Sequence, residues 1–410
     1  MRLGSLALTS VVLAAIAGSP ALAAPGGHEA PVRFATFNAS INRFSEGEAL
    51  ADLSTPGNAQ ASAVAEIIQR TRPDVLLINE FDYEPDEALA AAFQENYLSI
   101  TQQPDLEPID YPHVFVAPSN TGIPSGFDLD NDGEIGGPGD AFGFGFFPGQ
   151  FGMAVFSRYH IDEAAIRTFQ TFLWHDMPGA LLPDDPSTPE PADWYSSEEL
   201  DVFRLSSKSH WDVPVLIGRK TMHFLVSHPT PPVFDGPEDR NGTRNHDEIR
   251  FWADYIRPRR SSYIYDDAGG RGGLERGSLF VIAGDQNSDP LDGDSIPGSI
   301  QQLLELRRVN TSVTPSSPGG PEQAVLQGGA NDSHLSDPAF DTADFAEPPG
   351  NLRADYVLPR RRLRILGAAV FWPLSSDPAF EPVGVFPFPA SDHRLVWIDL
   401  AVGPESRRIF

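Results

Sequence analysis

Short runs of mostly apolar residues, each closed by a polar residue, recur along the chain. Four of these runs end at Asn38, Glu80, His228 and Asp285. Runs of four to eight apolar residues bounded by Gly, Pro and polar residues are typical of short, buried strands. The pattern therefore predicts strands that carry an amide, carboxylates and an imidazole to their ends.

Between the first two predicted strands, the apolar positions change to a helical period. Thr55 and Pro56 are expected to be the N-cap and first residue of a helix that stops before Pro73. The positions on its buried face are Val64, Ile67, Ile68 and Thr71. A second amphipathic helix is predicted over residues 244–256. Strand, helix and strand in succession indicate an α/β fold with layers of helices against sheets.

The second half of the chain continues the strand pattern. Residues 208–215 and 222–228 read as a hairpin, and residues 279–283, 354–358, 366–371 and 395–400 read as further strands. Asp355 lies near the start of one of these strands, and Asp392 and His393 immediately precede the last. His393 needs a carboxylate to orient its far nitrogen, and Asp355 is the natural candidate if the strands are neighbours.

The N-terminal residues have a different pattern. Arg2 precedes an apolar run over residues 3–17, followed by Ala21-Leu22-Ala23. This is the pattern of a cleaved secretory signal, and it is too short for a membrane span. We therefore expect residues 1–24 to be a signal peptide and the mature protein to be secreted or periplasmic, without stable membrane insertion.

Composition narrows the possible partners. The formal net charge of −28 argues against tight, non-specific binding of long nucleic acid, although it leaves room for a local cationic cleft. The chain has no cysteine, so an exported protein of this sequence relies on its core, and on any bound metal, rather than on disulfides.

Residues 104–150, 170–200 and 311–350 are rich in Pro, Gly and Asp and are predicted as long insertions. The first contains the candidate calcium ligands Asp128, Asp130, Asp132 and Glu134. Alternating acids followed by Gly match the start of a calcium loop. The closing Glu of that pattern is missing, because its position is Gly139, with Asp140 one residue later. A solvated acidic turn is the alternative.

Basic residues near the centre of the chain are candidates for phosphate binding. They are Lys208, Arg244 and His246. Arg244 and His246 lie close in sequence to His228, so they could face an anionic ligand. An ordinary ion-pair role explains the same residues equally well.

Together, the polar residues at strand ends resemble the endonuclease/exonuclease/phosphatase superfamily, which has the DNase I-like fold. The resemblance rests on Asn38, on Glu80, on His228, on Gly284-Asp285-Gln286-Asn287, on Asp355 and on Ser391-Asp392-His393, in family order. The sequence has Asn79-Glu80 where the family often has Gln-Glu, and Gly-Asp-Gln-Asn where it often has Gly-Asp-Phe-Asn. The resemblance implies a four-layer α/β/β/α sandwich, a single domain over residues 31–401 with the three insertions.

The resemblance also implies a metal site and roles for the site residues. Asn38, Glu80 and Asp392 would hold Mg²⁺ or Mn²⁺. Asp285 and Asn287 would position and activate the attacking water, and His228 and His393, the latter held by Asp355, would donate to phosphate oxygens. Whether Asp285 or His393 is the base stays open.

The function implied is that of a secreted, divalent-metal-dependent phosphodiesterase, monomeric, acting on nucleic acid or on a smaller or lipid phosphodiester. One alternative is a phosphomonoesterase of the phytase-like kind. Another is a non-catalytic, calcium-binding extracellular protein, in which the loop containing Asp128 carries the function and the residues at strand ends are structural.

Overall fold

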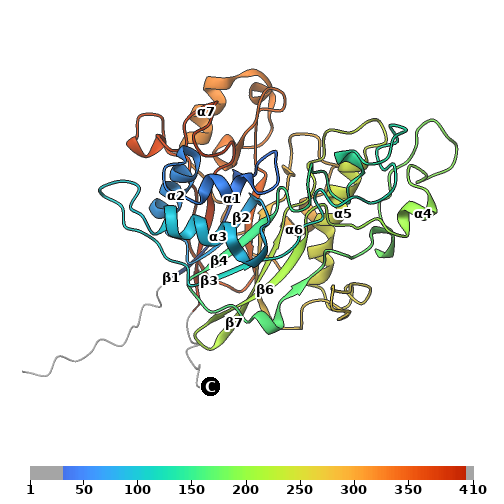
Figure 1. Ribbon diagram of the computed structural model, residues 1–410, viewed down its shortest axis with the longest axis horizontal. Helices are drawn as coiled ribbons and strands as arrows, with labels where there is room; N and C mark the ends of the chain where they lie inside the picture. Colours follow the sequence, from blue (N-terminus) through green and yellow to red (C-terminus); the bar gives the residue numbers. More distant parts are fainter. Residues whose placement is uncertain (1–30, 403–410) are drawn as a thin grey trace, which may run out of the picture.

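The computed structural model describes residues 31–402, and within them two mixed sheets form the centre of the protein (Figure 1). The first sheet has the strand order β12 (Ile365–Val370), β13 (Val396–Ala401), β1 (Pro31–Ile41), β2 (Val75–Phe81), β4 (Met153–Ser157) and β3 (His113–Val116). The second has the order β11 (Asp355–Pro359), β8 (Leu279–Asp285), β7 (Lys220–Ser227), β6 (His210–Ile217) and β5 (Arg167–Thr168). The short strands β9 (Ala343–Asp344) and β10 (Asn351–Leu352) pair separately.

Helices cover the outer face of each sheet. Those of the described chain are α1 (Glu48–Leu53), α2 (Ala59–Thr71), α3 (Ala88–Phe93), α4 (Ser197–Leu200), α5 (Arg240–Tyr255), α6 (Gln301–Leu304) and α7 (Gly319–Gln327). In Figure 1, α1–α3 lie on the side of the first sheet and α5 and α6 on the side of the second. The predicted four-layer α/β/β/α sandwich is thus confirmed.

The apolar core of β8 shows why its sequence is hydrophobic at successive positions. Val281 and Ala283 pack in the cluster between the sheets, whereas Phe280 and Ile282 pack in the cluster beneath α5. Successive side chains of a strand point to opposite faces, so a strand covered on both faces needs apolar residues throughout. Residues up to Ala283 therefore pack in the core, and the polar side chain of the strand comes at its end, at Asp285.

The pairing of the strands brings their polar ends to one edge. β1 and β2 are parallel, as are β7 and β8, so each pair ends at the same edge of its sheet. β11 runs antiparallel to β8 and pairs Asp355 with Asp285. β13 pairs with β1, which places the residues before β13 beside the end of β1. The polar residues at these strand ends therefore meet where the two sheets adjoin.

Several predicted boundaries were wrong. Helix α2 begins at Ala59, not after Thr55, because Asn58 is the N-cap and its side chain accepts a hydrogen bond from the Ala61 backbone N–H. Helix α5 begins at Arg240, four residues before the expected start. Residues 104–150, 170–200 and 311–350 are mostly loop, but the first range contains β3 and the third contains α7.

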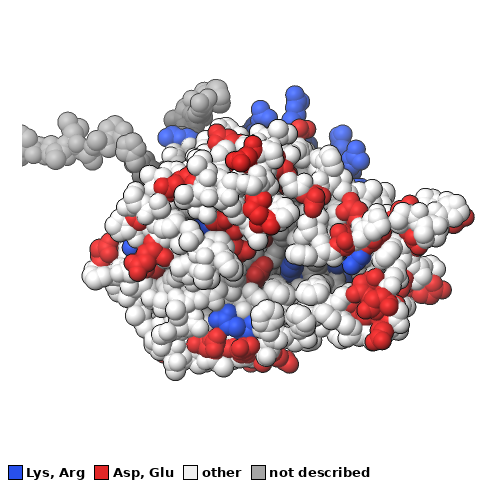
Figure 2. Space-filling model, turned by 90° about the horizontal axis from the view of Figure 1, so that it is seen from above, with Lys and Arg blue, Asp and Glu red and all other residues white. Residues whose placement is uncertain are grey.

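Charge is spread unevenly over the surface. Acidic groups occupy much of the face seen in Figure 2, and basic groups appear in fewer places. No helix within residues 31–402 is both long and apolar enough to span a membrane. The predicted signal peptide, residues 1–24, lies outside the described residues.

Candidate active site at the junction of the two sheets

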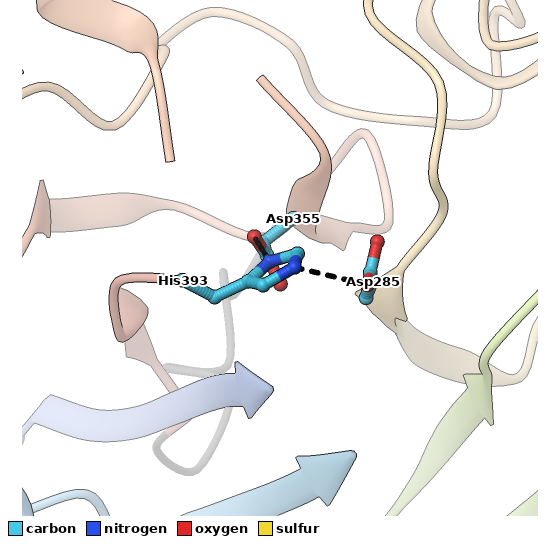
Figure 3. Close-up of side chains that lie close together, drawn as sticks. All are labelled: Asp285, Asp355 and His393. Carbon is cyan, nitrogen blue, oxygen red and sulfur yellow. Dashed lines mark hydrogen bonds and ion pairs between the residues drawn. The ribbon is translucent and has the colours of Figure 1, made fainter. Parts of the chain in front are cut away.

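Asp285 is the centre of a buried polar cluster at the end of β8 (Figure 3). Its Oδ2 atom lies 3.1 Å from Asn38 Nδ2, 3.4 Å from His228 Nε2 and 3.6 Å from His393 Nε2. Asn38 ends the straight part of β1, His228 follows β7, and His393 precedes β13. One carboxylate oxygen thus faces side chains from three separated parts of the chain.

Two asparagines tie the sheets together beneath this carboxylate. Asn38 Nδ2 also donates to Glu80 Oε1 at 3.0 Å. Asn79 Oδ1 accepts the backbone N–H of Asp285 at 3.2 Å and the hydroxyl of Thr36 at 3.2 Å. Asn79 was noticed in the sequence only as a departure from the family pattern. Its contact joins β2 to β8, and strand periodicity alone does not indicate a contact between sheets.

His393 and Asp355 form a hydrogen-bonded pair. His393 Nδ1 lies 2.8 Å from Asp355 Oδ2, so the imidazole presents Nε2 toward Asp285. The hydroxyl of Thr342 donates to the same Asp355 oxygen at 2.8 Å and accepts the Asp355 backbone N–H at 2.9 Å. Ser391 Oγ accepts the backbone N–H of His393 at 3.1 Å. The ring is therefore held through both its side chain and its backbone. The contact of Thr342 with Asp355 was not predicted from the sequence.

The electrostatics of the pair follow from burial and opposite charge. Burial raises the pKa of Asp355 to about 6, with His393 opposing the shift and Asp285 adding to it. Burial alone would lower the pKa of His393, but Asp355 and Asp285 hold that pKa well above its ordinary value. Burial would raise the pKa of Asp285, but the His393 charge and the contacts of His228 and Asn38 bring it below its ordinary value. The cluster therefore favours an anionic Asp285 beside a cationic His393.

His228 differs from His393 in its charge state. Burial, followed by the nearby charge of Lys208, lowers the pKa of His228 to about 4, although Asp285 acts in the opposite direction. Its Nδ1 atom is buried without a hydrogen-bond partner. His228 is thus a neutral imidazole at neutral pH, with Nε2 directed at Asp285.

Glu80 has two features expected of a carboxylate that can bind a cation. Its backbone is left-handed, with φ of 54°, which a non-glycine residue adopts only when its surroundings impose it. Burial raises its pKa, the Asn38 hydrogen bond opposes the shift, and the charge of Asp392 adds to it. A divalent cation next to Glu80 and Asp392 would offset both the burial and the mutual repulsion. The donor set, carboxylates with an amide nearby, fits a hard cation such as Mg²⁺.

A second group of potential ligands overlaps the site. Ligand atoms of Asp285, Asp355 and His393 all lie within 4.8 Å of one another. However, Asp355 Oδ2 already accepts from His393 and from Thr342. Within residues 31–402, the Glu80 carboxylate accepts only the hydrogen bond from Asn38, so the oxygen atoms of Glu80 are the freer ligands.

The two asparagines Asn38 and Asn287 contact Asp285 in different ways. The amide nitrogen of Asn38 faces Glu80 and Asp285, and Asn38 Oδ1 accepts the Ser40 backbone N–H at 3.3 Å. At Asn287 the chain turns, with φ of 48°. The Asn287 backbone N–H donates to Asp285 Oδ1 at 2.8 Å, and its side chain donates to the Pro229 carbonyl.

The three predicted phosphate-binding residues fall in different places. Lys208 is buried close enough to interact electrostatically with Glu80 and Asp285, and burial lowers its pKa. Arg244 donates to the carbonyls of Leu205, Phe142 and Arg204. It therefore connects loops to one another and does not face the cluster around Asp285. His246 contacts Asp247, its neighbour in the sequence, at 3.0 Å. Of these three residues, only Lys208 lies near the cluster around Asp285.

The acids that lie together in the predicted calcium loop differ from the predicted set. Oxygen atoms of Asp128, Asp130 and Asp140 lie within 4.8 Å of one another. Asp132 instead accepts the Glu134 backbone N–H, and no contact of the Glu134 side chain is recorded in the described chain. Asp140, one residue beyond the expected closing position, takes the place of Asp132 because the loop closes through a turn at Pro138.

Comparison with known proteins gives one family match. The sequence matches the Endonuclease/Exonuclease/phosphatase family over residues 35–393. No curated protein sequence matches the chain significantly.

Solved structures with a similar fold include three from different prokaryotes. An endonuclease/exonuclease/phosphatase from Beutenbergia cavernae DSM 12333 is 16% identical, with 90% of this chain and 71% of that chain covered and a TM-score of 0.47. An endonuclease/exonuclease/phosphatase family protein from Leptotrichia buccalis C-1013-b is 14% identical, covering 90% and 99%, with a TM-score of 0.45. An AP endonuclease from Archaeoglobus fulgidus is 13% identical, covering 90% and 98%, with a TM-score of 0.44.

The family match over residues 35–393 spans most of the chain and includes every residue of the site, from Asn38 to His393. The chain therefore belongs to the endonuclease/exonuclease/phosphatase family, and its class of activity is metal-dependent hydrolysis of phosphate esters.

Proposed function

We propose that this protein is a secreted phosphodiesterase that uses Mg²⁺ or Mn²⁺. The observation that carries the proposal is the meeting of Asn38, His228 and His393 at one oxygen of Asp285, beside the pair formed by His393 and Asp355. This arrangement offers an anionic group for a proton and imidazoles for developing negative charge, which are the two needs of water attack on a phosphodiester.

Glu80 and Asp392 are the residues that we propose hold the metal, with Asn38 fixing the direction of the Glu80 carboxylate through its 3.0 Å hydrogen bond. When bound, the metal would neutralise phosphate charge and stabilise the departing oxygen. The rest of the chemistry falls to side chains of this chain.

Asp285 is the proposed base. Its Oδ2 atom accepts Asn38 Nδ2 and faces the imidazoles of His228 and His393 at 3.4 and 3.6 Å, and its Oδ1 atom accepts the Asn287 N–H, so the carboxylate is fixed in direction. A protonated His393, oriented through Nδ1 by Asp355, would donate from Nε2 to a non-bridging phosphate oxygen. The opposite assignment requires His393 to lose its proton while it lies between two carboxylates, which is the less favourable charge state.

Lys208 is the proposed cationic contact for the substrate phosphate. It is the predicted phosphate-binding residue whose charge reaches Glu80 and Asp285. An ammonium group at the base of the site would offset the second negative charge that builds on the phosphate during attack.

The acidic surface favours substrates smaller than nucleic acid. With a net charge of −28, the protein repels a long polyanion except where a local cationic region overrides the rest. A small or lipid phosphodiester places one phosphate in the site and avoids most of this repulsion. A nuclease activity would require a strong dependence on salt.

The test is hydrolysis of bis-p-nitrophenyl phosphate by the purified protein, with Mg²⁺ or Mn²⁺ and with EDTA. We expect turnover only with metal, and a faster rate on the bis-ester than on p-nitrophenyl phosphate. A faster rate on the mono-ester would favour the phosphomonoesterase, and no metal-dependent rate on either ester would favour the non-catalytic calcium-binding protein. The Asp105→Asn variant, a change of an exposed acid, is the control for protein handling.

Secretion has its own test. Expression with residues 1–24 intact should deliver the protein to the periplasm or the medium with a new N-terminus near Ala23, which N-terminal sequencing detects. Retention of the full-length chain in the cytoplasm would contradict export.

A further inference from the structure

Six arginines surround a hollow at the end of the second sheet opposite the candidate active site. The hollow has a volume of about 430 Å³, and the arginines that line it are Arg276, Arg307, Arg308, Arg360, Arg361 and Arg362. The chain has 29 basic and 57 acidic residues, so a cluster of six positive charges is unusual for it. We call it the arginine hollow.

The topology explains how three separate segments meet there. Arg276 lies just before β8, and Arg360 follows β11, the antiparallel neighbour of β8. The Arg360 N–H donates to the Phe280 carbonyl at 2.9 Å, and the Arg361 N–H donates to the Arg308 carbonyl at 2.7 Å. The backbone of all three segments is thus fixed by hydrogen bonds, so the guanidinium groups project from a rigid base.

The arginine hollow is remote from the candidate active site. It adjoins the start of β8 at Leu279, whereas Asp285 is the last residue of that strand. At about 3.3 Å per residue, the strand separates the two by roughly 20 Å. A ligand in the hollow is therefore not a substrate lying in the catalytic cluster.

Within the described residues, the six guanidinium groups lack acidic partners. No ion pair recorded among residues 31–402 involves any of them, and no side-chain hydrogen bond from them is recorded in that range, whereas Arg33, Arg167 and Arg394 each have a carboxylate within 4.0 Å. Arg308 Nε is buried with no hydrogen-bond partner. Burial, followed by the charges of Arg360 and Arg276, lowers the pKa of Arg308. Repulsion between unpaired like charges raises the free energy of the folded protein, and a bound anion would lower it.

We propose that the arginine hollow binds a compact anion carrying two or more phosphate groups. Guanidinium groups match phosphate oxygens in pairs of hydrogen bonds, and several of them around one hollow suit an anion of several negative charges. The volume lies within the range of small-molecule sites. An extended polyanion is disfavoured, because beyond the hollow it would meet a surface whose acidic residues greatly outnumber the basic ones.

Titration calorimetry with tripolyphosphate in EDTA at physiological salt tests this proposal on the full mature protein. We expect one site per chain, and orthophosphate should bind at least tenfold more weakly. The double variant Arg308→Ala/Arg361→Ala should lose at least tenfold in affinity for tripolyphosphate. The matched control is Arg259→Ala/Arg260→Ala, which removes the same charge from an exposed arginine pair outside the hollow.

Because Arg308 is partly buried, its variant could fail to fold, so Arg361→Gln/Arg362→Gln, which changes two exposed residues, is the second variant. Equal losses in the hollow variants and in the control would overturn the proposal, as would the absence of binding by the wild-type protein. Tighter binding of single-stranded DNA or of phosphatidylglycerol vesicles, with the same dependence on Arg361 and Arg362, would also overturn it. Hydrolysis of bis-p-nitrophenyl phosphate should be unchanged in these variants, so this test is independent of the proposed catalytic function.

Discussion

Two groups of potential metal ligands in this protein are similarly compact but have very different surroundings. In both the Asp285, Asp355 and His393 group and the Asp128, Asp130 and Asp140 group, ligand atoms lie within 4.8 Å of one another. The first group is buried at strand ends, and each member contacts another member. The second lies on a loop, where Asp128 and Asp140 mostly accept backbone N–H groups of the same loop.

Short distances between ligand atoms therefore do not by themselves define a catalytic site. A loop that wraps its own carboxylates can adapt to a cation, but its geometry depends on that loop only. The strand-end group is held by two sheets and contains an imidazole, so its charges and directions are fixed before any ligand arrives. Catalysis needs such fixed groups, whereas a stabilising ion site does not.

The largest expected effect comes from removing the strand-end chemistry. Asp285→Asn or His393→Ala should lower kcat on bis-p-nitrophenyl phosphate by about 10² to 10⁴, the scale of a lost acid–base partner. Circular dichroism should show a folded protein. The control is His175→Ala, which changes an exposed histidine away from the cluster. Unchanged kinetics in a folded Asp285 or His393 variant would contradict their proposed roles.

A smaller effect is expected from the residue that orients His393. Asp355→Asn removes the negative charge that helps to hold the pKa of His393 high, so His393 should lose its proton at lower pH. We expect kcat to fall by about 10 to 10², and the alkaline limb of the pH–rate profile to move toward lower pH. Thr342→Val, which removes one hydrogen bond to Asp355, should move the profile in the same direction by less. A lower rate with an unmoved profile would point to a structural role only.

The buried carboxylate of Asp341 shows how burial without a hydrogen-bond partner within the described residues affects the stability of the folded state. Its Oδ1 atom is buried with no hydrogen bond, and burial together with Asp289, Asp292 and Asp337 raises its pKa to about 8. Because the folded pKa exceeds the unfolded value of about 3.9, the folded state binds the proton more tightly, and stability is lost as the pH rises from about 4 to 8.

Asp341→Asn should remove this loss. The variant is expected to be more stable than the wild type by at least ~1 kcal/mol at pH 8, with the difference shrinking toward pH 4. Thermal unfolding over this pH window, with EDTA present, measures it. Asp105→Asn should show no such trend, and a difference that does not depend on pH would contradict the argument.

The smallest expected effect concerns the loop. Calcium should raise the Tm of the wild type by a few degrees, since a ligand at 100 times its Kd stabilises by about 2.7 kcal/mol. Asp130→Asn should abolish most of this shift without changing kcat, whereas Asp132→Asn should keep it. Equal losses in both variants would favour the sequence pattern over the observed geometry, and no shift in the wild type would leave the loop as a solvated turn.

Much of the fold was predictable because its signals are local. Apolar runs ended by polar residues revealed β1, β2, β7 and β8, and the family pattern then supplied the four layers. Parallel pairing of β1 with β2 and of β7 with β8 brings Asn38 beside Glu80 and His228 beside Asp285, since parallel strands end at the same edge. His393 joins them through the antiparallel pairing of β13 with β1. The catalytic and metal-binding roles of these residues stay predictions.

Contacts between distant segments were not predictable. Asn79 reaches from one sheet to the other, and Thr342 supports Asp355 from a loop, so neither leaves a periodic signal in the sequence. Nearness in sequence also misled: Arg244 lies close along the chain to His228 but donates to carbonyls of other loops. The arginine hollow was not predicted because its six arginines come from three separate segments of the chain.

The pairing of β1 with β13 has a consequence for the stability of the cluster. β1 is the first strand of the described chain and β13 the last, and the imidazole of His393 reaches Asp285 only when these two strands are docked. Asp285 and Asp355 are instead paired with each other on β8 and β11. Local opening of β13 would therefore withdraw the imidazole and leave the two carboxylates in place.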